Sequence, residues 1–147
     1  PLLTQEVIDI PKRGFVNIHT GLVQYHRGVD SSYWALYEGR PETIGATVHY
    51  IDRTIDGGDV VAQRQNRILS IGDTADDIFL KNCAVGISLL RENVHDILYF
   101  EGNNILAEKK GKLYQKKDMN RDIMKLIRKK TPKILEEYLD GNNIRSL

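Results

Sequence analysis

The stretch that decides the fold spans residues 45–65 and reads GATVHYIDRTIDGGDVVAQRQ. Residues 45–51 are rich in β-branched and aromatic side chains, which predicts a strand, and a further strand is expected over residues 60–68. The connection between them, residues 52–59, is polar and contains two adjacent glycines. Such a connection is typical of a surface loop that carries function.

A shorter run upstream, FVNIH at residues 15–19, predicts another strand. Successive side chains of a strand point to opposite faces of its sheet. Asn17 and His19 are therefore expected on one face, with Val16 and Ile18 on the other.

Helical segments alternate with these strands, and residues 20–28 are expected to form a loop. Periodicity, capping residues and breakers place helices at residues 4–10, 31–38, 75–100, 120–130 and 132–140. The longest begins at a capping-box pattern, Thr74-x-x-Asp77. Its expected apolar stripe consists of Ile78, Phe79, Cys83, Ile87, Leu90, Val94 and Ile97. An edge hairpin is expected from residues 105–108 and 112–114, and the whole alternation predicts an α/β fold.

The composition of the 147-residue chain bounds its class. There are 21 Lys and Arg against 20 Asp and Glu, a net charge of +1, which argues against dedicated nucleic-acid binding. The single cysteine, Cys83, excludes an intramolecular disulfide and fits a reducing compartment. No apolar run approaches the roughly 18 residues of a membrane span. We therefore expect a cytoplasmic protein of one domain, with neither membrane nor nucleic acid among its partners.

The basic C-terminal segment is interpreted as a solvated helix face. Its cationic residues are Arg121, Lys125, Arg128, Lys129, Lys130 and Lys133. Because the overall charge is close to zero, this cluster alone does not predict binding to an anionic surface.

Three polar side chains are candidates for a reactive site: Asn17 and His19 from one strand face, and Asp56 from the glycine-containing loop. An amide N–H stabilises an oxyanion, such as that of a tetrahedral intermediate, and an imidazole moves a proton. A carboxylate fixes the tautomer of the imidazole and raises its basicity. On the residues alone, a purely structural role for the Asn-x-His sequence stays open.

A metal site is the other use that histidines and carboxylates suggest. The candidate ligands are His26, His49, His95, Asp52 and Asp59. No pair shows a ligand spacing such as His-x₃-His, so no metal is expected.

Three segments occur in an order that resembles the catalytic domain of the 10-formyltetrahydrofolate-dependent formyltransferases. They are Asn17-Ile18-His19, Gly45-Ala46-Thr47-Val48-His49-Tyr50 and Ile55-Asp56-Gly57-Gly58. The resemblance implies the C-terminal part of a Rossmann-like domain, with a mixed sheet, flanking helices and a small C-terminal hairpin. It places residues 1–102 in that part of the domain and residues 103–147 in the hairpin and terminal helices packed on it. Because family members carry a parallel-sheet half before these segments, we expect the chain to be a portion of a larger formyltransferase.

By position, the resemblance assigns Asn17 to the formyl oxygen of the donor and pairs His19 with Asp56 in catalysis. The implied co-substrate is 10-formyltetrahydrofolate. The loop residues assigned to it are Asp52, Arg53, Thr54, Ile55 and Gly57. The residues assigned to the amine substrate are Thr20, Gly21, Tyr25, Arg27 and His49.

The expected amine is a small molecule, a nucleotide-linked amino sugar. Where many members read Pro-Ser-Leu-Leu-Pro after the histidine, residues 20–24 here read TGLVQ, a variant more similar to the sugar N-formyltransferases. Two alternatives stay open: a hydrolase that uses water as the acceptor at the same three residues, and a non-catalytic fragment that acts through dimerisation or partner binding. Homo-oligomerisation stays open with them.

Overall fold

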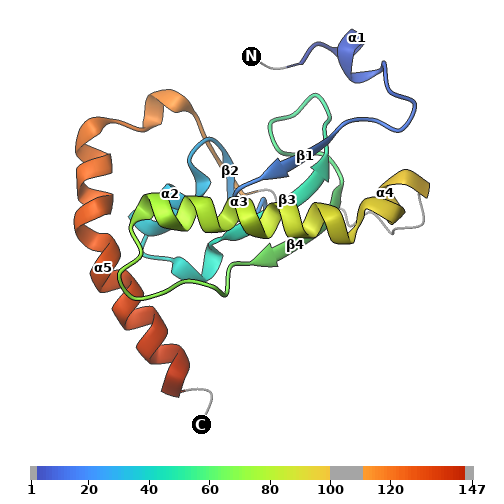
Figure 1. Ribbon diagram of the computed structural model, residues 1–147. Coiled ribbons are helices and arrows are strands. Elements are labelled where there is room, and N and C mark those ends of the chain that lie inside the picture. The colour runs from blue at the N-terminus through green and yellow to red at the C-terminus, as the bar shows by residue number, and fades with distance from the viewer. Residues whose placement is uncertain (1–2, 100–110, 145–147) are drawn as a thin grey trace.

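The computed structural model of the protein describes residues 3–99 and 111–144. Its strands are β1 (Val16–His19), β2 (His26–Gly28), β3 (Gly45–Tyr50), β4 (Val60–Gln65) and β5 (Lys112–Tyr114). Its α-helices are α1 (Gln5–Ile8), α2 (Ser31–Tyr37), α3 (Ala75–Glu92), α4 (Val94–Tyr99) and α5 (Arg121–Ile144), and the short 3-10 helices are η1 (Pro41–Thr43) and η2 (Lys116–Asp118). This mixture of helices and sheets confirms the predicted α/β class (Figure 1).

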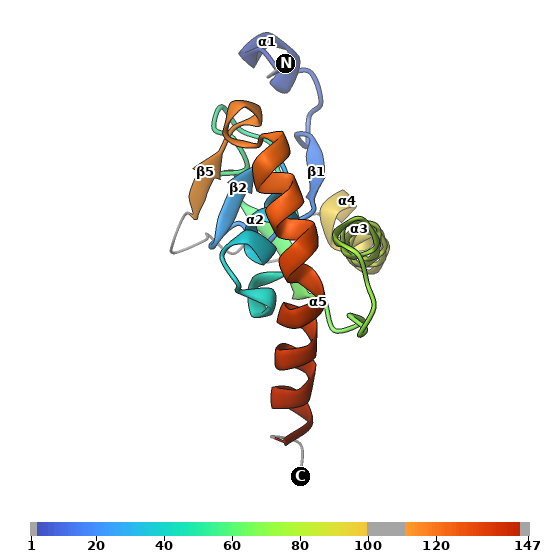
Figure 2. The same ribbon diagram turned by 90° about the vertical axis from the view of Figure 1, so that its left-hand side faces the viewer.

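The main sheet is antiparallel and has the strand order β1-β3-β4. In its register, Asn17 lies opposite His49 and His19 lies opposite Thr47. One face of this sheet is covered by α3, while β2 and β5 lie on the other side (Figure 2). The sheet therefore presents one face to a hydrophobic layer and the other to the loops that follow β1 and β3.

The layer between the sheet and α3 is apolar. Ala46 and Val48 of β3 and Leu89 of α3 are buried there, and Val16 and Ile18 of β1 pack against them. This confirms the expected alternation along β1, which leaves Asn17 and His19 on the opposite face. A second core cluster joins α2, α3 and α5, and its fully buried members include Leu36, Ile44, Ile78, Ile127 and Leu135.

A second, two-stranded sheet differs from the sequence prediction. The expected loop over residues 20–28 ends in a strand, β2, and β2 pairs in parallel with β5. The first arm of the expected hairpin, residues 105–108, lies outside the described residues, as does the expected boundary at residue 102. The observed partner of residues 112–114 is thus a segment more than eighty positions earlier, a pairing that local sequence cannot reveal.

The predicted helix over residues 75–100 is wrong in its length and in its apolar stripe. It begins at the expected capping box of Thr74 and Asp77, but it is divided into α3 and α4 at Asn93, whose side-chain amide donates to the carbonyl of Leu89 at 2.8 Å. Ile87, expected in the stripe, is 61% exposed. The buried face instead runs through Ile78, Asn82, Gly86 and Leu89.

Two of these buried residues explain why the stripe is displaced. Asn82 accepts a hydrogen bond of 2.7 Å from the buried side chain of Asn66, so a polar residue is satisfied inside the core. Gly86 lies against Ile18, and a Cβ placed there would be 2.3 Å from the Ile18 Cγ2. A stripe predicted from apolar residues alone therefore omits both Asn82 and Gly86.

The two predicted terminal helices are one helix, α5, with Pro132 inside it. Proline removes one helical hydrogen bond and normally ends or kinks a helix. Here Ile127, Thr131 and Leu135 are buried on one face of α5, and the Thr131 hydroxyl donates to the carbonyl of Ile127 at 2.8 Å. Packing of this face against α2 keeps the helix continuous through the proline.

Within the described residues, no helix combines the length and the apolarity needed to cross a bilayer.

The close approach of α3 to β1 predicts a stability difference between two helical glycines. Gly86→Ala is expected to lower the free energy of unfolding. Alanine gains about 1 kcal/mol over glycine in a helix, but overpacking against Ile18 costs about 1–3 kcal/mol and outweighs that gain. Gly141→Ala in α5 is the matched control, since no described atom lies within 4 Å of its new Cβ, and it is expected to raise stability. Urea unfolding of both variants measures the difference, and an equal gain in both would contradict the tight α3–β1 contact.

Candidate functional site

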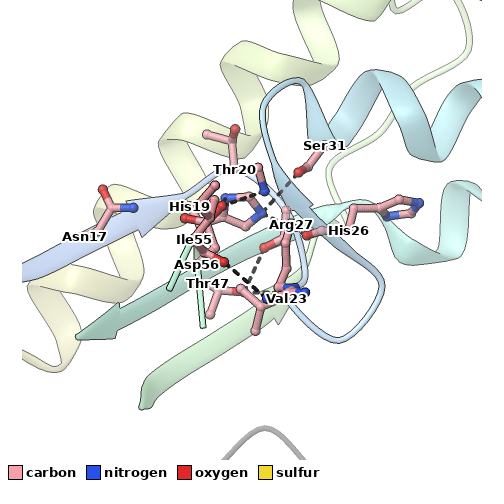
Figure 3. Close-up of polar contacts among 12 residues, drawn as sticks. Asn17, His19, Thr20, Val23, His26, Arg27, Ser31, Thr47, Ile55 and Asp56 are labelled. Carbon is pink, nitrogen blue, oxygen red and sulfur yellow. Dashed lines mark hydrogen bonds and ion pairs between the residues drawn. The ribbon is translucent and has the colours of Figure 1, made fainter. Parts of the chain in front are cut away.

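The side chains singled out in the sequence meet on the face of the sheet opposite α3 (Figure 3). His19 Nδ1 lies 3.3 Å from Asp56 Oδ2, which confirms the expected proximity of residues 37 positions apart. His49 Nε2 lies 3.5 Å from Asp56 Oδ1 and 3.3 Å from Asn17 Nδ2. The arrangement is therefore one contiguous polar cluster: Asn17, His49, Asp56 and His19.

The loop between β3 and β4 delivers Asp56 to this cluster. The loop begins with a local turn in which Asp52 Oδ1 accepts the backbone N–H of Thr54 at 2.7 Å. Near its end lies Gly58, where a Cβ would lie 2.0 Å from the carbonyl oxygen of Tyr50, so no side chain fits there. A register irregularity in the β3–β4 pairing at Val48 and His49 accompanies this loop. Bulges of this kind redirect side chains at the ends of strands.

Asp56 itself adopts a left-handed backbone conformation, with φ of 47°. This region is uncommon for residues other than glycine, although aspartate tolerates it better than most. The backbone N–H of Gly28 donates to Asp56 Oδ2 at 2.7 Å and so fixes the carboxylate. Burial raises the pKa of Asp56, but the hydrogen bond from protonated His49, the charge of protonated His19 and the Gly28 N–H together outweigh it and hold the pKa below its ordinary value. Asp56 is thus an anion at neutral pH.

His19 is almost enclosed by protein, with 6% of its surface exposed. Its Nε2 lies 3.0 Å from the carbonyl oxygen of His26 and 3.1 Å from the hydroxyl of Ser31, while Nδ1 faces Asp56. A neutral ring carries one proton, so it cannot donate both to the carbonyl and to the carboxylate. Only the protonated ring satisfies both acceptors.

Two opposing effects set the charge of His19. Burial lowers its pKa, and the negative charge of Asp56 and the carbonyl of His26 raise it, with burial the larger effect. The nearby imidazoles of His49 and His26 lower it further. His19 is therefore neutral at neutral pH, in surroundings that stabilise a transient proton.

His49 orients the amide of Asn17. The Nδ1 of His49 lies 2.8 Å from the carbonyl oxygen of Tyr50, which assigns its proton to Nδ1 and leaves Nε2 as an acceptor. Asn17 Nδ2 then donates one proton to His49 Nε2, and its second N–H remains for a substrate oxygen. Asn17 can in this way present a donor in a fixed direction.

A hollow of about 210 Å³ opens directly above Asn17 and His49. Its other lining residues are Leu3, Ile51, Asp52, Arg53, Thr54, Ile55 and Asp56. Four of the five residues expected to contact the donor, Asp52 to Ile55, thus share one cavity with Asn17, His49 and Asp56 of the polar cluster. The fifth, Gly57, follows Asp56 in the loop. A larger hollow of about 520 Å³ lies between α2 and α5, but none of the predicted site residues lines it.

The residues expected to bind the amine are more dispersed. Of the five, His49 lines the hollow. Gly21 is buried against His19, where a Cβ would lie 2.7 Å from the imidazole Nε2. The ring of Tyr25 lies 5.1 Å from the guanidinium carbon of Arg40.

Arg27 and Thr20, the other two, make hydrogen bonds within the protein. Arg27 donates to the carbonyl oxygens of Gly111 and Ile55. The carbonyl of Thr20 accepts from the side chain of Asn82 at 3.4 Å.

Three contacts to the cluster were not expected from the sequence: the Gly28 N–H, the His26 carbonyl and the Ser31 hydroxyl. Two of them are backbone groups, whose direction depends on the path of the chain and not on residue type. Ser31 carries no local motif that would distinguish it from its neighbour Ser32.

The opposing effects of burial and of Asp56 on the pKa of His19 predict how this pKa changes when Asp56 is replaced. The pKa of His19 is expected to lie below the ordinary histidine value of about 6.5, and Asp56→Asn is expected to lower it further, because the variant removes the negative charge that favours the imidazolium. NMR titration of the imidazole resonances measures both values. Asp96→Asn is the control, since this acid on α4 contacts His95 instead. A rise in the pKa of His19 in Asp56→Asn would contradict the assigned geometry.

Comparison with known proteins shows the family to which the chain belongs. The profile of the formyl transferase family matches residues 1–93. A curated relative, the methionyl-tRNA formyltransferase of Desulforamulus reducens, is 34% identical over 96 residues, which cover 64% of this chain and 29% of the relative. The chain thus spans about a third of the length of such relatives.

Two solved structures show the same fold. One is the formyltransferase PseJ from Anoxybacillus kamchatkensis, in complex with UDP-4,6-dideoxy-4-formamido-L-AltNAc and tetrahydrofolate (TM-score 0.70, 24% identity, 80% of this chain and 61% of that one). The other is an N-formyltransferase from Helicobacter canadensis, in complex with folinic acid and dTDP-3-aminofucose (TM-score 0.62, 25% identity, 72% of this chain and 39% of that one). Since the family profile covers more than half of the sequence, the chain belongs to the formyl transferase family.

Proposed function

We propose that this chain carries the reactive centre for transfer of a formyl group from 10-formyltetrahydrofolate to an amine. The observation that carries the proposal is the polar cluster of Asn17, His49, Asp56 and His19 beside the hollow that the β3–β4 loop encloses. Family membership supports it, because the matched region contains all four residues.

The hollow has the chemistry that a folate ring requires. Leu3, Ile51 and Ile55 supply apolar contact area, and the peptide groups of the loop supply hydrogen-bonding partners for a polar heterocycle. We assign Asp52 to Ile55 and Gly57 to this role. When bound, the donor supplies a formyl carbon that is open to attack by a neutral amine.

Asn17 would hold the formyl oxygen. As the amine nitrogen bonds to the formyl carbon, negative charge grows on this oxygen, and a preorganised N–H stabilises that charge. The free N–H of Asn17 Nδ2 is suited to this because His49 holds the other one. No reorganisation of the amide is then needed during the reaction.

His19 and Asp56 would manage the proton. Formation of the new C–N bond leaves the amine nitrogen with a proton to lose, and breaking the bond to the folate nitrogen gives that atom a proton to gain. Asp56, an anion 3.3 Å from the imidazole, takes up the proton directly or through one water, and His19 stabilises the arrangement. The proton lost by the amine thus balances the proton gained by the leaving nitrogen.

For the acceptor, we propose a nucleotide-linked amino sugar. The Helicobacter canadensis enzyme has a bound dTDP-amino sugar, and residues 20–24 of this chain depart from the Pro-Ser-Leu-Leu-Pro pattern. The curated relatives, in contrast, are methionyl-tRNA formyltransferases. Parallel assays with nucleotide-linked amino sugars and with methionyl-tRNA, read by mass spectrometry of the N-formyl product, distinguish the two acceptors.

Removal of the Asn17 amide tests the role of the cluster. In the full-length enzyme, Asn17→Ala is expected to lower kcat by about 10² to 10³, the usual loss for one oxyanion donor. Asn93→Ala is the matched control, because its amide makes one hydrogen bond at the α3–α4 junction, away from the cluster. Turnover of Asn17→Ala close to that of the control at saturating substrates would refute the assignment.

A further inference from the structure

Arg27 joins two segments that lie far apart in the sequence. Its Nε donates to the carbonyl oxygen of Gly111 at 2.9 Å, and one terminal nitrogen donates to the carbonyl oxygen of Ile55 at 3.4 Å. Figure 3 shows the Arg27 side chain beside Ile55 and Asp56. The guanidinium therefore bridges the β3–β4 loop and the residue that precedes β5.

The carbonyl of Ile55 belongs to the peptide unit that leads into Asp56. The orientation of this peptide sets φ of Asp56, which is 47°. A left-handed residue other than glycine persists only where its surroundings hold it. Two neighbouring residues of β2 do so here: Arg27 holds the peptide, and Gly28 holds the carboxylate.

The other end of the bridge is rigid. Gly111 donates its N–H to the carbonyl of Val23 at 2.8 Å, and a Cβ on Gly111 would lie 2.3 Å from the backbone of Tyr25. Lys112 continues the pairing with an N–H bond of 3.0 Å to the carbonyl of Tyr25. Arg27 is thus anchored to a backbone that is itself hydrogen-bonded to the segment before β2.

We propose that Arg27 is a positioning residue for Asp56, and that it acts by tying the Ile55 peptide to Gly111. The inference rests on the proposed function. It replaces the direct contact with the amine that the sequence suggested for Arg27. It also makes the placement of Asp56 depend on Gly111, which precedes β5 and lies beyond the 93 residues that match the family profile.

The charge of Arg27 and its positioning role have opposite effects on His19. The groups that face His19 are Asp56, His49, His26 and Ser31. Loss of a nearby positive charge alone would raise the pKa of His19, because the imidazolium would feel less repulsion. Release of Asp56 from its place would lower it, because Asp56 is the group that favours the imidazolium.

The experiment compares Arg27→Gln and Arg27→Lys with Arg64→Gln, a control on β4 whose side chain pairs with Glu92 on the surface. NMR titration is expected to show the pKa of His19 lowered in Arg27→Gln, toward its value in Asp56→Asn, and lowered less in Arg27→Lys. In formyl-transfer assays, kcat is expected to fall by about tenfold to a hundredfold in Arg27→Gln, with KM for the amine nearly unchanged, as for a small misplacement of a reacting group.

A pKa of His19 that is unchanged or raised in Arg27→Gln would overturn the proposal. So would a raised KM for the amine at unchanged kcat, since that result indicates direct contact with the substrate. Where thermal melting shows that Arg27→Gln does not fold, Arg27→Lys, which keeps the charge, carries the same test. The titration requires no turnover, so absence of formyl transfer in the full-length enzyme would refute the proposed function and leave the positioning of Asp56 to be decided by NMR.

Discussion

The carboxylate of Asp56 contacts residues from three strands, β1, β2 and β3. It accepts the N–H of Gly28 at the end of β2, and it faces His19 of β1 and His49 of β3. Its side chain is 14% exposed, and withdrawing a carboxylate from water costs several kcal/mol unless hydrogen bonds and polar neighbours offset the loss. Each strand supplies one part of this compensation. The relative placement of β1, β2 and β3 is therefore tied to a single buried charge.

The placement of Asp56 also depends on β5, in the C-terminal part of the described chain. Gly28 has φ of 86°, and a Cβ at this position would lie 2.0 Å from the carbonyl oxygen of Tyr114 in β5. The donor of the hydrogen bond to Asp56 thus sits in a left-handed conformation, pressed against a strand that comes 86 residues later. Asp56, the acceptor, is left-handed as well. Because Gly28 both donates to Asp56 and packs against Tyr114, the parallel pairing of β2 with β5 is part of what fixes the reactive geometry.

The sequence predicts the features that depend on nearby residues. The alternation along β1 separates Asn17 and His19 from the apolar face, and the Thr74 capping box begins α3 as expected. Prediction fails where a distant contact overrides local preference. Gly86 lies on the buried face of α3 because Ile18 occupies the position that a side chain would take there. The periodicity of apolar residues along the helix does not predict this contact. The Gly28 N–H is equally hidden, because every residue except proline has such a group and only the fold selects the one that meets Asp56.

The charge state of the cluster links the site to the stability of the fold. The pKa of His19 is lowered by burial, so as pH falls below about 6.5 the unfolded chain takes up a proton that the folded protein resists, and stability is lost until pH reaches the folded pKa. The pKa of Asp56 is also lowered, so its contribution is present above its unfolded value and is lost only in stronger acid. At neutral pH Asp56 therefore contributes its full stabilisation as a carboxylate, while His19, as a neutral imidazole, carries no penalty of protonation. Proton transfer at this pair must work against the burial of His19. The Asp56 anion reduces that opposition, so the same carboxylate that orders the strands also stabilises positive charge on the imidazole beside it.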